Sequence, residues 1–105
     1  MKKHFIAAVC AEGIHGGIIT LKDDAFYFTA HKIMTVPERY TKVMIPYDEI
    51  ETIFSTIVAS MGVVYLVNEI VLKNGKKHDF MVLNQKRFLK CMDMMLKENE
   101  HHGSE

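Results

Sequence analysis

The feature that most constrains the fold of this chain is a single change of hydrophobic period near Asn84. Before it, short segments alternate apolar and polar residues or are rich in β-branched residues, which is typical of strands. After it, apolar residues recur at intervals of three and four, namely Phe88, Cys91, Met92, Met95 and Leu96. Charged residues lie between them, so the segment predicts an amphipathic helix of about four turns, with Asn84 as its N-cap. The apolar stripe of this helix needs a partner, and the predicted sheet is the one available.

The segments before Asn84 predict seven antiparallel strands. They span residues 4–12, 17–22, 25–31, 41–45, 50–59, 63–73 and 77–83. Residues 13–17 are expected to form a loop, because their three glycines supply the permissive backbone that a turn needs. Asn74-Gly75 is the strongest hairpin signal in the chain, since both residue types tolerate positive φ.

Length and composition indicate one soluble globular domain. The chain has 105 residues, 49% of them apolar and 25% charged, and we expect a domain at 1–98 with a flexible tail at 99–105. Lys plus Arg equals Asp plus Glu at 13 each, which argues against nucleic acid as a partner. The apolar run at 5–11 is too short for a signal or membrane segment, so a cytoplasmic location is expected. Cys10 and Cys91 have apolar neighbours and are expected to be buried free thiols.

Three stretches in this order resemble the pleckstrin-homology (PH)-like superfold, in its GRAM and bacterial PH-like branch. Gly17-Ile-Ile-Thr-Leu-Lys-Asp-Asp-Ala-Phe-Tyr-Phe is similar to the family's second and third strands with their tight turn. Val43-Met-Ile-Pro-Tyr-Asp-Glu-Ile is similar to its strand, Pro, polar turn and isoleucine. Ile70-Val-Leu-Lys-Asn-Gly-Lys-Lys-His-Asp-Phe-Met-Val is similar to its sixth and seventh strands.

The resemblance implies a mainly β fold, an antiparallel β-sandwich or partly open barrel of about seven strands capped by one C-terminal amphipathic helix. Many helices of this family carry a tryptophan against the mouth of the sandwich. This chain has no tryptophan, and Phe88 is the nearest substitute.

The resemblance also brings three loops together at one open end of the sandwich. Six cations would then lie on or near that end: Lys32, Arg39, Lys42, Lys73, Lys76 and Lys77. They could bind an anionic partner such as a lipid headgroup on a membrane surface. The alternative, which we favour, is a solvated set of loop side chains diluted by Glu12, Glu38 and Asp79. PH domains that bind phosphoinositides place their basic pattern elsewhere, at positions that correspond to 13–21 here, where only His15 can become cationic.

Apolar residues occupy both faces of the two predicted strands between 50 and 67. They are Ile53, Ile57, Val58, Met61, Val63, Val64, Tyr65, Leu66 and Val67. A strand with one wet face should alternate instead. Either another chain covers the second face, with a homo-oligomer or a protein partner as the expected assembly, or the terminal helix or the 33–40 loop covers it. The candidate interface residues are Ile53, Ile57, Met61, Val63, Tyr65 and Val67.

No catalytic, cofactor or metal motif is recognisable in the sequence. It contains no nucleophile elbow, P-loop or G-x-G-x-x-G, and its six histidines show no H-x-x-x-H spacing. The methionines at 81, 92, 94 and 95 are expected to fill an irregular core, with a plastic peptide groove as the alternative. The sequence therefore predicts a non-catalytic interaction or self-assembly module without a cofactor, with binding of anionic lipid headgroups as the alternative.

Overall fold

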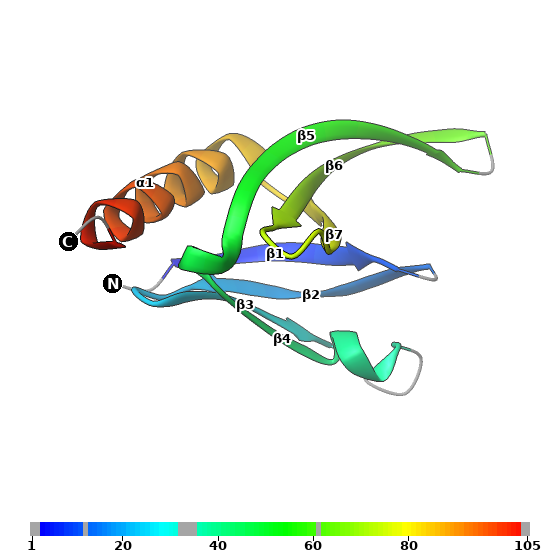
Figure 1. Ribbon diagram of the computed structural model, residues 1–105. Helices are drawn as coiled ribbons and strands as arrows, with labels where there is room; N and C mark the ends of the chain where they lie inside the picture. The colour runs from blue at the N-terminus through cyan, green and yellow to red at the C-terminus, as the bar shows by residue number, and fades with distance from the viewer. Residues whose placement is uncertain (1–2, 12, 32–35, 61, 104–105) are drawn as a thin grey trace.

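The computed structural model describes residues 3–11, 13–31, 36–60 and 62–103, and within these ranges seven strands precede one helix (Figure 1). The strands are β1 (Lys3–Cys10), β2 (Ile14–Leu21), β3 (Ala25–Ala30), β4 (Lys42–Pro46), β5 (Ile50–Ser60), β6 (Val63–Leu72) and β7 (Lys77–Val82). The helix α1 spans Gln85–Gly103, and two 3-10 turns, η1 (Glu38–Tyr40) and η2 (Tyr47–Glu49), flank β4.

The strands form one antiparallel sheet in the order β4-β3-β2-β1-β7-β6-β5. β1 and β7 pair in the middle and join the two halves of the chain, and the sheet curls into a half-barrel that α1 closes (Figure 1). β4 and β5 are its two edges. The predicted mainly β fold of about seven antiparallel strands with one C-terminal helix is confirmed.

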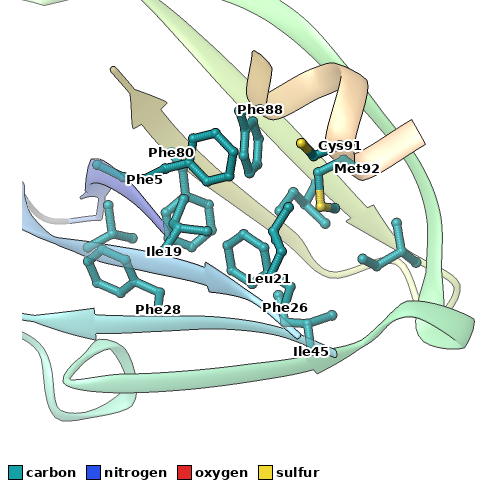
Figure 2. Packing of buried hydrophobic residues seen from close by; sticks show 14 of the residues in the cluster. Phe5, Ile19, Leu21, Phe26, Phe28, Ile45, Phe80, Phe88, Cys91 and Met92 are labelled. Atoms are coloured by element: carbon teal, nitrogen blue, oxygen red, sulfur yellow. The ribbon is translucent and has the colours of Figure 1, made fainter. Parts of the chain in front are cut away.

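The core lies between the concave face of the sheet and α1 (Figure 2). The helix contributes the apolar residues that its period predicted, with Phe88, Cys91, Met92 and Met95 buried. The Phe88 ring meets the Phe5 ring edge-on at 5.4 Å between centroids. Burial of this stripe attaches the helix to the sheet, because each fully buried large apolar side chain contributes about 1.5–3 kcal/mol.

The Asn74–Gly75 hairpin is confirmed between β6 and β7. Gly75 has a φ of 92°, and the Asn74 side-chain Oδ1 accepts a hydrogen bond from the Lys76 amide at 2.9 Å. The amide of Gly75 donates to the carbonyl of Leu72 at 2.9 Å. Residue types that favour this turn therefore set the register of the two strands.

The predicted loop at 13–17 is wrong, because β2 already begins at Ile14. Gly13, with a φ of 116°, belongs to the turn, whereas Gly16 and Gly17 are strand residues. Gly17 lies opposite Ala30 of β3, and a Cβ atom at Gly17 would lie only 2.3 Å from the Thr29 carbonyl oxygen. A close approach of two strands, rather than a turn, requires this glycine.

The helix begins directly after Asn84, at the predicted N-cap position, but it ends later than predicted. The backbone carbonyl of Asn84 accepts the first hydrogen bond of the helix, from the Phe88 amide at 3.1 Å. The φ of Asn84 is 62°, in the left-handed region. The helix continues to Gly103, beyond its expected end at Glu98 and into the expected tail; residues 104–105 lie outside the described ranges. The Asn99 side-chain Nδ2 supports this extension by donating to the Met95 carbonyl at 2.9 Å. In the described part of the chain, no helix combines the length and hydropathy needed to cross a membrane.

Candidate functional site

The outer part of the β5–β6 hairpin projects beyond the rest of the molecule (Figure 1). β7 pairs with β6 only from Asn68 to Val71, so residues 63–66 of β6 extend past the end of β7 and pair with β5 alone. We call residues 54–60 and 62–66 the distal hairpin. Its projection makes the molecule long, with dimensions of 46 × 27 × 26 Å.

Both faces of the distal hairpin carry exposed apolar side chains. On the face that continues from the core residues Ile53 and Ile70, Ile57 lies opposite Leu66, and these side chains are 67% and 51% exposed. On the other face, Val58 lies opposite Tyr65, and Phe54, Val58 and Val63 are exposed. The first residue of α1, Gln85, reaches the base of the distal hairpin and donates from its side-chain Nε2 to the Ser55 hydroxyl at 2.7 Å. Ile57, Val58, Val63, Val64 and Leu66 remain exposed, so much of the distal hairpin is an apolar ribbon on the surface.

The predicted interface residues differ in their exposure to solvent. Ile57 and Val63 are exposed, Tyr65 is half-buried, and Ile53 packs against the core. Val67 is only 1% exposed, so its assignment to the interface is wrong; it lies next to Asn68, where β7 joins β6. Met61 lies outside the described residues. The candidate set omits Phe54, Val58, Val64 and Leu66, all of which are exposed, because the sequence does not show where the hairpin leaves the body.

The two edges of the sheet differ in the groups that they present. β4 has five residues and includes Lys42 and Pro46, and η1 and η2 flank it. β5 has eleven residues, with no proline or lysine and Glu51 as its one charged side chain. Short length, lysine and proline are devices that prevent edge strands from pairing with other chains. β4 has all three, and β5 has none of them.

A cavity of about 610 Å³ lies where η1 and β4 face the β6–β7 turn. Four of the six predicted cations line it: Arg39, Lys42, Lys76 and Lys77. Lys73 lies in the same turn but is not part of the lining, and Lys32 falls outside the described residues. Arg39 also lies over the Tyr40 ring at 5.2 Å from its centroid.

Neutral polar groups and one carboxylate also line this cavity. The Tyr40 hydroxyl and His78 Nδ1 share a hydrogen bond at 3.0 Å, and burial, together with the charge of Lys76, lowers the pKa of His78. This shift favours the neutral imidazole of His78. Glu49 lies in the cavity lining, and Glu69 pairs with Lys77 at 4.0 Å. The cavity keeps a net positive charge, partly compensated by these acids.

Two titratable groups outside the cavity lining, Asp79 and Cys10, have shifted pKa values. Burial, a hydrogen bond to Glu69 and the charge of Glu69 raise the pKa of Asp79. Burial and the charge of Asp79 raise the pKa of the Cys10 thiol, which opposes formation of a nucleophilic thiolate. Within the described ranges, no three or more His, Cys, Asp or Glu side chains gather in a way that could hold a metal ion.

Comparison with known proteins shows a shared fold but no family. No family model matches the chain, and no curated protein matches it. Among solved structures, the chain is similar to the crystal structure of the C-terminal domain of an unknown protein from Leishmania infantum. The TM-score is 0.67 at 16% sequence identity, and the match covers 90% of this chain and 82% of that chain. Similarity at this identity shows a shared fold.

Proposed function

We propose that this chain is a non-catalytic module of PH- and GRAM-like type that self-assembles through the distal hairpin. The observation that carries the proposal is the apolar side chains exposed on both faces of the hairpin, with Ile57 67% and Val64 66% exposed. Exposed apolar surface that is contiguous usually marks an interaction site in a soluble protein. A second chain in contact with the hairpin can reduce the exposure of these side chains.

The ribbon geometry of the distal hairpin supports the same proposal. Residues 63–66 have β5 on one side and no strand on the other within the described chain. Two-stranded ribbons are marginally stable in water on their own. Contact with another copy would therefore stabilise the hairpin and reduce the exposure of its apolar side chains.

Ile57→Glu is expected to convert an oligomer into a monomer. The unsubstituted chain should show a molar mass well above 12.1 kDa in light scattering at micromolar concentration. Burial of a carboxylate in an apolar contact is unfavourable, so we expect the dissociation constant to rise at least about 30-fold, equivalent to about 2 kcal/mol. Circular dichroism should show an unchanged fold, because Ile57 is exposed within one copy.

Met44→Glu is the matched control for this experiment. Met44 is 56% exposed and lies on β4, the opposite edge of the sheet. It should leave the molar mass unchanged. A chain that stays at 12.1 kDa across the micromolar range, or equal effects of the two substitutions, would contradict the proposal.

The cationic cavity supports a second candidate function, the binding of anionic lipid headgroups. Arg39, Lys42, Lys76 and Lys77 come from separate segments and converge on one concave site. A phosphate group within that cavity could contact several of these cations at once, and charge-assisted hydrogen bonds of this kind are stronger than neutral ones.

The double substitution Lys42→Ala and Lys76→Ala should weaken co-sedimentation with anionic vesicles. Each lysine near a membrane contributes about 1 kcal/mol, so the pair should lower the affinity about 30-fold. Lys90→Ala is the control, because this exposed lysine lies on α1 and away from the cavity. Equal recovery on neutral and anionic vesicles, or recovery that salt does not reduce, would rule this function out.

A further inference from the structure

We infer that a second copy of this chain adds to the free edge of β5, so that the two β5 strands pair antiparallel across a two-fold axis. The inference rests on the proposed self-assembly and specifies which groups meet. Two seven-stranded sheets would become one continuous sheet through this contact. The four central strands would then be β6 and β5 of one copy followed by β5 and β6 of the other.

The free edge of β5 offers backbone groups to another strand. β6 occupies one side of β5 from Thr52 to Ser60, and β5 is the last strand of the sheet. On the other side, alternate N–H and C=O groups therefore point away from the molecule. The residues from 52 to 60 contain no proline that would remove a donor and no glycine that would loosen the strand.

The side chains of this edge favour an identical strand as the partner. From Thr52 to Ser60 the strand has no charged residue. It therefore lacks the charge that would select a partner of opposite sign, and two copies would not repel each other. A two-fold contact uses the same patch on both copies and closes after two chains. The other edge strand, β4, is short and contains a proline, so it is a poor template for pairing with a further copy. The expected assembly is therefore a dimer.

The side-chain pattern favours a register with the two-fold axis at Thr56. In that register Phe54 lies opposite Val58 of the second copy, an aromatic and β-branched pair of the kind that stabilises sheets. Ile57 lies opposite Ser55 of the second copy. Glu51 falls outside the paired stretch, next to the irregularity between Ile50 and Thr52. An axis at Ser55 would instead bring Glu51 against Ala59 and Phe54 against Thr56.

Oxidative cross-linking of Thr56→Cys tests this arrangement. Directly opposed residues of an antiparallel pair have Cα atoms about 4.5–5.5 Å apart. This separation lies within the range of a disulfide, about 4.4–6.8 Å. We expect a covalent dimer on a non-reducing gel after mild oxidation, which a reductant returns to monomer. The unsubstituted chain, with Cys10 and Cys91, measures the background.

Thr52→Cys is the matched control, because Thr52 is the same residue type on the same strand and the same face. In the proposed register it lies opposite Ser60 of the second copy, so two introduced thiols stay far apart and should not link. If light scattering shows a dimer but Thr56→Cys links no more than Thr52→Cys, the β5 pairing is overturned while self-assembly stands. If the unsubstituted chain is monomeric, both fail.

Amide hydrogen exchange of the unsubstituted chain provides a second readout that needs no substitution. Pairing across β5 should slow exchange at alternate amides between 52 and 60 as protein concentration rises. Amides of β4 should exchange at a rate that does not depend on concentration. Exchange in β5 that is equally independent of concentration would overturn the inference.

Discussion

Gly17→Ala is expected to destabilise the protein by about 3 kcal/mol, at the upper end of the usual range for overpacking. A Cβ atom at Gly17 would lie 2.3 Å from the Thr29 carbonyl oxygen and 2.7 Å from Cζ of Phe28. The first of these is a backbone atom of β3, and Phe28 is buried in the core, so neither can move freely. β3 would have to shift away from β2, with loss of sheet pairing and of core packing.

Gly16→Ala provides a control one residue away on the same strand. The nearest atom to a Cβ there is His31 Cδ2 at 3.8 Å, an ordinary van der Waals distance. Alanine also reduces the conformational freedom of the unfolded chain, so this variant should be neutral or more stable by up to about 1 kcal/mol. Urea denaturation of both variants at one protein concentration measures the difference. Equal midpoints would show that β2 and β3 do not approach each other as closely as described.

Phe88→Ala is expected to lower the free energy of unfolding by about 3–5 kcal/mol. The ring is fully buried between α1 and the sheet, with the Phe5 ring at 5.4 Å and the Phe26 ring at 6.4 Å (Figure 2). Truncation removes both edge-to-face contacts and leaves a cavity under the helix. For a domain whose total stability is about 5–15 kcal/mol, this is a large fraction.

Met94→Ala on the same helix is the control, because Met94 is exposed and makes no part of the core cluster. Its stability should remain within about 0.5 kcal/mol of the unsubstituted chain. Denaturation with guanidinium, followed by circular dichroism, measures both variants at equal concentration. A loss below about 1 kcal/mol for Phe88→Ala would mean that the helix does not depend on this ring for its attachment to the sheet.

Local patterns in the sequence predicted the elements of this fold. The residues after Asn84 repeat at helical spacing, and the helix buries Phe88, Cys91, Met92 and Met95 as that spacing requires. The Asn74-Gly75 turn and the alternation of Phe26, Tyr27 and Phe28 were equally readable. Such features depend on neighbours within a few residues, whose identity alone favours one backbone conformation.

The cations of the candidate cavity were only partly predictable. Arg39 and Lys42 are separated by more than thirty residues from Lys76 and Lys77, and the curl of the sheet brings them to one cavity. The expectation that loops meet at one end came from the resemblance to a known superfold and included three loops. The cavity lining contains residues from the β3–β4 connection and the β6–β7 turn but none from the β1–β2 turn. The resemblance could not separate Lys73, in the β6–β7 turn, from the residues of the lining, because that depends on where each side chain points.

The sequence by itself determined the alternation of strands, the closing helix and the presence of apolar residues on both faces of 50–67. Only the tertiary structure decided that Val67 is buried while Ile57 and Phe54 are exposed, and that Gly17 serves a close strand contact rather than a turn. The physical reason is that secondary structure follows from nearby residues. Burial depends instead on where segments that are distant in the sequence begin and end beside each other in the fold. β7 pairs with β6 only from Asn68 onward, so within the described residues the distal hairpin has no third strand beside it.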